Sequence, residues 1–208
     1  QGGLTTHPDL QIRNVWTTIL YKIQSPMIRF IIKQAKKIIV ANEYEKKIFS
    51  QLTDENRIEV VRNGINLESM KSSVNFKKKY AVNQNYFLFL GRFHRVKGID
   101  TLLKAINLIK DHPIMSNVKL VVMGVDFGFE GEMLKMIKEM GLDNIIKVIK
   151  NPPREDVIAA YKESEFLVLP SRWELSPLTP LEGFAFKKPT NSTKAHGIQY
   201  TIHDGKAS

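Results

Sequence analysis

The sequence predicts an α/β fold with a parallel sheet covered by helices on both faces. Short apolar runs alternate with stretches of helical periodicity from residue 86 to residue 186, and this alternation is typical of parallel sheets. The runs contain few polar residues, as expected of strands that are buried on both faces. The 208 residues are 43% hydrophobic and 25% charged, which is ordinary for a globular protein and argues against general disorder.

From residue 86 onward the expected elements follow one another at short intervals. Strands are expected at 86–90, 118–123, 145–149 and 166–169, and helices at 99–111, 130–140, 154–162 and 180–186. A further strand is expected after Pro189, but its sequence, Thr-Asn-Ser-Thr, is polar. An asparagine such as Asn191 would be costly in a buried strand, because its amide needs partners there.

The first 84 residues show a different pattern. An amphipathic helix interrupted at Pro26 is expected within 14–39, then a short buried strand at 37–41, a helix at 43–52 and a strand at 58–61. The apolar positions of the first helix are Ile28, Ile31, Ile32 and Ala35, with basic residues between them. Such a helix either packs on a domain core or lies on a membrane surface. Residues 66–84 are polar and are interpreted as a connection with one short helix.

The charge and the missing residue types exclude several classes of protein. The net charge is +10, of which +7 lies in residues 1–84; this favours polyanionic partners, with a solvated basic surface as the alternative. The absence of cysteine excludes a disulfide scaffold and a cysteine nucleophile. The sequence contains no run of 18 apolar residues, which is about the length needed to span a membrane. The chain begins with Gln-Gly-Gly, without Met or a signal-peptide pattern, and is therefore expected to be a fragment.

Candidate ligand-binding residues follow the expected strands. Gly91 and Arg92 come after the first of them and precede Lys97, while Gly124 ends the second. Because ligands of open parallel sheets bind beyond the carboxyl ends of the strands, these residues are expected to converge at one edge. An arginine fork and a lysine ammonium there suit a phosphate or diphosphate; the alternative is a pair of solvated loop cations.

The segment after the strand at 166–169 adds a helix start and two carboxylates. Thr179 or Ser176 is expected to cap a helix that has Pro180 in its first turn, and the free N–H groups would favour an anion. Glu174 and Glu182, with seven residues between them, could accept hydrogen bonds from sugar or ribose hydroxyls. The alternatives are a glycosidase pair, or a Glu182 that caps its own helix beside a solvent-facing Glu174. No dinucleotide fingerprint, phosphate loop, Asp-x-Asp or close histidine pair is present.

These motifs together resemble the family 4 retaining glycosyltransferases of the GT-B fold. The carrying residues are Gly91-Arg92, Lys97-Gly98, Gly124, Pro170-Ser171, Glu174 and Glu182-Gly183, with Lys37–Asn42 and Val60–Asn66 upstream. The resemblance implies two Rossmann-like domains, both incomplete in this chain. It implies that residues 1–65 end the acceptor-side domain, 66–84 connect the two, and 85–208 form a nucleotide-sugar-binding domain truncated before its closing helix.

The resemblance also implies roles for residues. Arg92 and Lys97 would hold the donor diphosphate, Glu174 would contact the donor sugar, and Glu182 would take the ribose hydroxyls. Backbone around Pro177, Leu178 and Thr179, with Ser176, Gly91 and Gly124, would complete the donor site.

The implied reaction is transfer with retention from a nucleotide-diphosphate sugar to a saccharide or lipid-linked acceptor, without a metal or other cofactor and without nucleic acid. The implied location is the cytoplasm, with peripheral contact to the inner face of the membrane left open. The alternative function is a non-catalytic nucleotide-binding module or a basic polyanion-binding domain. Because a fragment would lack most of the acceptor-side domain, the chain alone is expected to be inactive.

Overall fold

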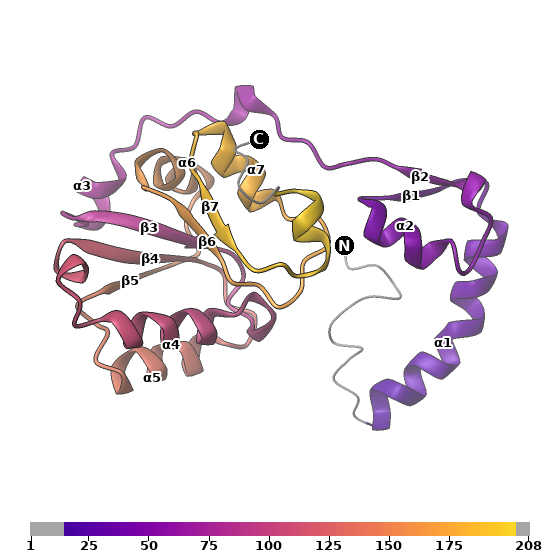
Figure 1. The fold of residues 1–208 in the computed structure, drawn as a ribbon, viewed down its shortest axis with the longest axis horizontal. Helices are drawn as coiled ribbons and strands as arrows, with labels where there is room; N and C mark the ends of the chain where they lie inside the picture. Colours follow the sequence, from indigo (N-terminus) through magenta and orange to yellow (C-terminus); the bar gives the residue numbers. More distant parts are fainter. Residues whose placement is uncertain (1–14, 203–208) are drawn as a thin grey trace.

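The computed structural model describes residues 15–202 and contains two parallel sheets (Figure 1). The smaller sheet has two strands, and the larger has five in the order β5-β4-β3-β6-β7. Every pairing in both sheets is parallel. The predicted α/β fold with a parallel sheet and flanking helices is therefore confirmed.

The elements follow the expected order with small shifts at their ends. The first unit contains α1 (Val15–Gln34), β1 (Ile38–Val40), α2 (Glu43–Phe49) and β2 (Ile58–Val60), and α3 (Phe76–Tyr80) lies in the connection that follows. The larger unit contains β3 (Asn85–Leu90), α4 (Ile99–Ile109), β4 (Val118–Gly124), α5 (Glu130–Glu139), β5 (Ile146–Lys150), α6 (Arg154–Glu163), β6 (Leu167–Leu169), α7 (Leu178–Ala185) and β7 (Thr190–Ser192). A 3₁₀ turn at His196–Tyr200 follows β7.

Two expectations for the first unit are wrong. Helix α1 runs through Pro26 without a break, although proline cannot donate a backbone hydrogen bond there and its ring crowds the carbonyl of the preceding turn. Ile28 and Ile32 are buried, as packing on a core requires, whereas Ile31 is 52% exposed. Strand β1 was expected to be buried, but only one of its faces is: Val40 is buried, whereas Ile39, which points to the opposite face, is 70% exposed.

The core of the larger unit has two halves, one on each face of the sheet. Phe87 and Phe89 of β3 pack with residues of α4 and α5 on one face. Tyr86 and Leu88 of the same strand pack with residues of α3 and α6 on the other. This follows from the alternation of side chains along a strand, which also makes a strand buried on both faces apolar throughout.

The polar strand after Pro189 lies at an edge of the sheet. Strand β7 pairs only with β6, and Asn191 is exposed. The expected desolvation cost of Asn191 therefore does not arise, because an edge strand leaves one side open to water.

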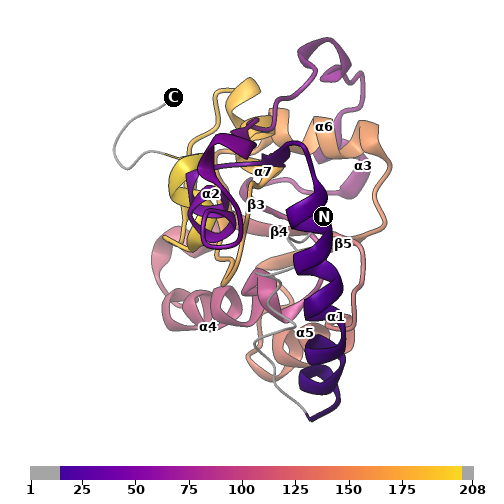
Figure 2. The same cartoon turned by 90° about the vertical axis from the view of Figure 1, so that its right-hand side faces the viewer.

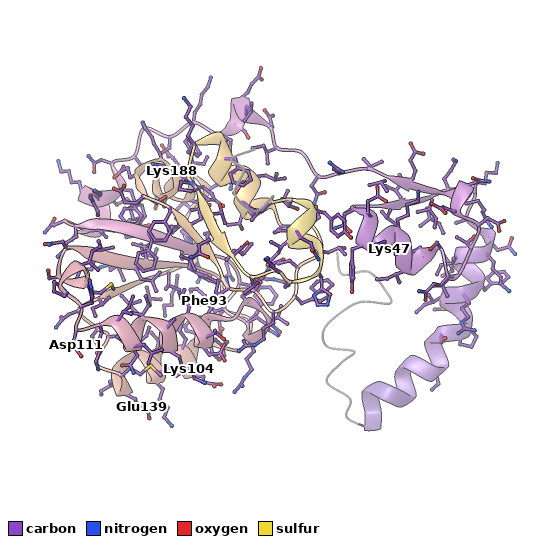
Figure 3. All side chains as sticks on the ribbon, viewed as in Figure 1. Lys47, Phe93, Lys104, Asp111, Glu139 and Lys188 are labelled. Carbon is purple, nitrogen blue, oxygen red and sulfur yellow. The ribbon has the colours of Figure 1, made fainter. Side chains whose placement is uncertain are left out.

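The strand order reverses between β3 and β6, which defines where a ligand site should form. The chain moves outward from β3 through β4 to β5, then returns to place β6 on the other side of β3. The carboxyl ends of these strands face the smaller unit (Figure 1), which lies in front in Figure 2. Phe93, labelled in Figure 3, is fully buried in the loop after β3. Open α/β sheets bind ligands at such a switch point.

Candidate functional site

Two glycines lie where β3 and β4 end. The N–H of Gly91 donates to the carbonyl of Met123 at 3.1 Å. A Cβ at Gly124 would lie 1.8 Å from the carbonyl oxygen of Gly91, so no larger residue fits at 124 without moving backbone. A Cβ at Gly91 would meet only side chains, at 3.5 Å or more. Neither position therefore carries a side chain at this edge of the sheet. Packing requires glycine at position 124 but not at position 91.

The loop after β3 packs on the loop after β6 and presents Arg92 to solvent. Gly98 has a φ of 67°, and a Cβ there would lie 2.0 Å from the carbonyl oxygen of Pro170. The Arg92 guanidinium lies 4.9 Å from the centre of the Phe127 ring, and within residues 15–202 it forms no ion pair. Its side chain is exposed, so its positive charge is available to an anion at the sheet edge.

Lys97 and Glu174 form a largely buried ion pair across the switch point. The Nζ of Lys97 lies 2.5 Å from Oε1 of Glu174, and their side chains are 16% and 8% exposed. The Ser171 hydroxyl donates to the same carboxylate oxygen at 2.8 Å. The alternatives of a solvated Lys97 and a solvent-facing Glu174 are therefore wrong: the two loops that end β3 and β6 bring these residues together.

Arg172 ties the same two loops together on their outer side. Its guanidinium donates to both carboxylate oxygens of Asp100 at 2.7 Å, and also to the carbonyl of Arg95. Hydrogen bonding to Arg172 lowers the pKa of the Asp100 carboxyl below its ordinary value. This anchor and the Lys97–Glu174 pair fix the β6–α7 loop against the start of α4.

Helix α7 begins two residues earlier than the sequence indicated. Its N-cap is Pro177, with no side-chain hydrogen bond, so the expected cap by Thr179 or Ser176 is wrong. Proline is tolerated throughout the first turn of a helix, and Pro180 therefore did not fix the first residue. Because no side chain caps the helix, the N–H groups of Leu178 and Thr179 remain available at the positive end of the helix dipole.

Glu182 lies one turn into α7 and is held by a residue of α6. Arg154 donates from Nη2 to Oε1 of Glu182 at 2.6 Å and from Nη1 to Oε2 at 3.1 Å. This hydrogen bonding raises the pKa of Arg154. The alternative in which Glu182 caps its own helix is therefore wrong, and its carboxylate has a fixed plane.

Residues of the smaller unit reach the β6–α7 loop, which the sequence analysis missed. The amide nitrogen of Asn42 donates to the carbonyl of Leu175 at 2.5 Å, and that of Asn63 donates to the carbonyl of Ser176 at 3.0 Å. A Cβ at Gly197 would lie 1.5 Å from the Leu175 carbonyl oxygen. The sequence offers only an Asn63-Gly64 pair, which is typical of a turn and gives no sign of this contact. Both asparagines thus fix backbone next to Glu174.

The structure brings some predicted site residues together and leaves others apart. Lys97 and Glu174 are in contact, whereas Arg92 contacts Phe127 and Glu182 contacts α6. The other predicted residues, Gly91, Gly124, Ser176, Pro177, Leu178 and Thr179, lie at strand ends or at the start of α7. In the described part of the chain, no group of three or more His, Cys, Asp or Glu residues could hold a metal ion. No helix of that part is long and apolar enough to cross a bilayer.

Solved structures of glycosyltransferases share this fold, which is the GT-B fold. Anabaena HepE in complex with UDP and glucose has a TM-score of 0.74 and 18% identity, over 87% of this chain and 50% of that protein. A glycosyltransferase from Rickettsia africae has a TM-score of 0.72 and 23% identity, over 82% of this chain and 48% of that protein.

Residues 71–208 match the family described as glycosyl transferases group 1, and the chain belongs to that family. A D-inositol 3-phosphate glycosyltransferase of Corynebacterium kroppenstedtii is 26% identical over 84% of this chain and 42% of its own length. An uncharacterised glycosyltransferase of Methanocaldococcus jannaschii is 30% identical over 85% of this chain and 45% of its own length. The chain thus spans somewhat less than half the length of these relatives.

Proposed function

We propose that the protein transfers a sugar from a nucleotide-diphosphate sugar, as a retaining glycosyltransferase of the family 4 type. The observation that carries this proposal is the Lys97–Glu174 pair at the strand-order reversal, beside an uncapped helix start. This arrangement joins a cation and backbone N–H groups for phosphate to a carboxylate for sugar hydroxyls. Family membership and the HepE complex with UDP and glucose support the same donor class.

Each group would act on a different part of the donor. Arg92 and Lys97 would bind the diphosphate, with the N–H groups of Leu178 and Thr179. Glu174 would orient the sugar, and Glu182 would accept hydrogen bonds from the ribose. Ser176, Pro177, Gly91 and Gly124 would contribute backbone, since the last two leave no side chain between ligand and sheet.

The proposed reaction needs charge stabilisation more than a base. The bond between the anomeric carbon and the diphosphate oxygen breaks, and the acceptor oxygen bonds to that carbon on the same face. The acceptor proton passes to the departing phosphate oxygen. Cations and helix N–H groups held in place beforehand stabilise the charge that develops on the diphosphate. The proposed mechanism requires no metal.

We propose the same division of the chain as the resemblance implies: residues 1–65 on the acceptor side, 66–84 as connection and 85–208 on the donor side. The acceptor would be a saccharide or a lipid-linked saccharide, reached from the cytoplasm at the inner face of the membrane. Exposed apolar side chains on α1, Ile23, Met27 and Phe30, stand beside the exposed Arg29 and Lys33, which supports peripheral membrane contact. Flotation with anionic vesicles tests this contact, and failure to float would exclude it.

Calorimetric titration of the intact protein with UDP, GDP and ADP, without added metal, tests the proposed donor site. We expect selective binding of one nucleotide. Arg92→Ala should reduce turnover more than donor affinity, because its charge matters most as the diphosphate departs. Glu182→Ala should weaken binding by about 1–3 kcal/mol if its hydrogen bonds are buried.

Lys135→Ala is the matched control, because Lys135 is an exposed cation whose ion pair, with Glu139 on α5, lies away from the sheet edge. No binding of any nucleotide by the folded protein would refute the proposal and favour a non-catalytic module. The anomeric configuration of the product, measured by NMR, tests retention separately, and an inverted product would exclude the same-face mechanism.

A further inference from the structure

Glu182 of α7 lies in a cluster with two residues of α6, Arg154 and Tyr161. Arg154, the first residue of α6, donates hydrogen bonds to both oxygens of the Glu182 carboxylate. The Nη2 of Arg154 also lies 3.2 Å from Sδ of Met70, so the guanidinium is held from two sides. The Glu182 side chain is only 13% exposed. Its carboxylate therefore cannot turn freely, and Arg154 sets its plane.

Tyr161 brings a hydroxyl to the same cluster from two turns further along α6. The side chain is fully buried. Its hydroxyl lies beside the side chains of Glu182 and Thr179, without a hydrogen bond of ordinary geometry to any described residue. Burial first, and then the neighbouring Glu182 carboxylate, raise the pKa of this hydroxyl. The ring stacks on Phe186 with their centres 6.3 Å apart.

We propose that Arg154 and Tyr161 are positioning residues that make Glu182 selective for a ribose diol, and hence for ribonucleotide over 2′-deoxyribonucleotide donors. This inference rests on the proposed function. A bidentate arginine uses one lone pair on each carboxylate oxygen and leaves the other lone pairs for two adjacent hydroxyls. The Tyr161 hydroxyl, beside the same carboxylate, can donate to it and keep its plane fixed when the ribose hydroxyls bind.

The test compares affinities for UDP, GDP and ADP with those for their 2′-deoxy forms, by calorimetry on the intact protein. The wild type should prefer the best ribonucleotide over its deoxy form by about tenfold. Arg154→Gln should remove most of this ratio by weakening only the ribonucleotide. Arg154→Lys, which keeps the charge but not the fork, should give an intermediate ratio and serves if the glutamine variant does not fold. Tyr161→Phe should lower the ratio about threefold.

Lys150→Gln is the matched control, because it also removes a cation of an ion pair at this sheet edge, the pair with Glu130 at 2.8 Å. Its ratio should stay at the wild-type value. In a Glu182→Gln background, Arg154→Gln should change the ratio no further. An equal loss for both nucleotide forms in Arg154→Gln would overturn the inference while leaving the donor site standing. Absence of binding by the wild type would instead overturn the proposed function, and the inference with it.

Discussion

Replacing Lys97 by methionine removes one half of the buried pair at the switch point while keeping an unbranched side chain. The Glu174 carboxylate, 8% exposed, would lose its cation and keep the hydrogen bond from Ser171. Breaking a buried ion pair in this way costs about 3–5 kcal/mol. Because Lys97 is 16% exposed and Ser171 remains, we expect the lower end of that range, about 3 kcal/mol. For a chain of this size the loss corresponds to a drop in Tm of roughly 6–12 °C.

Differential scanning calorimetry of three variants checks this magnitude. Lys97→Met combined with Glu174→Gln should recover most of the lost Tm, because no charge is then left unpaired in the site. Lys135→Met is the control: its pair with Glu139 is exposed and 3.7 Å long, so Tm should change by no more than about 2 °C. If Lys97→Met melted with the wild type, or if the double variant melted no higher than Lys97→Met, the pair would not be the buried unit described above.

Two further substitutions test how the loops around the site are held. Asp100→Asn removes the ion pair with Arg172, which keeps the folded-state pKa of Asp100 below its unfolded value of about 3.9. Above that pH the wild type should therefore have a higher Tm than Asp100→Asn. The difference in Tm should vanish as the pH falls through the folded-state pKa of Asp100. Gly98→Ala should destabilise by more than the about 1–2 kcal/mol of a left-handed alanine, because its Cβ would displace the Pro170 carbonyl. Gly141→Ala has nearly the same φ, 66°, in open space; equal denaturation midpoints for the two glycine variants would contradict the clash.

The sequence was most informative where one rule decides the outcome. The apolar runs that became β3 and β4 could be assigned because a strand covered on both faces has no polar alternation. Lys97 and Glu174, 77 residues apart, could be placed at one edge because parallel strands end there. Their direct contact could not, since it depends on the positions of two loops whose shapes no periodicity encodes.

Contacts between side chains on adjacent helices could not be predicted either, because periodicity does not encode which helices lie side by side. Arg154 is 28 residues from Glu182, and nothing in the spacing indicates that α6 and α7 would lie side by side. Asn42 is 133 residues from Leu175, and nothing in its sequence surroundings indicates that partner. Side-chain amides that bind distant backbone carbonyls leave no pattern in the sequence around them.

The hydrogen bonds from Asn42 and Asn63 imply that the proposed donor site depends on residues that precede the segment matched to the family. The match begins at residue 71, yet both asparagines precede it and hold carbonyls beside Glu174. A recombinant piece cut at residue 71 would keep every charged group of the proposed donor site and lose two of the donors that hold the backbone beside Glu174. Ligand affinities measured on such a piece would be those of a β6–α7 loop that lacks these two hydrogen bonds. A substitution at either asparagine would likewise loosen the backbone beside Glu174, although the asparagine lies outside the matched residues.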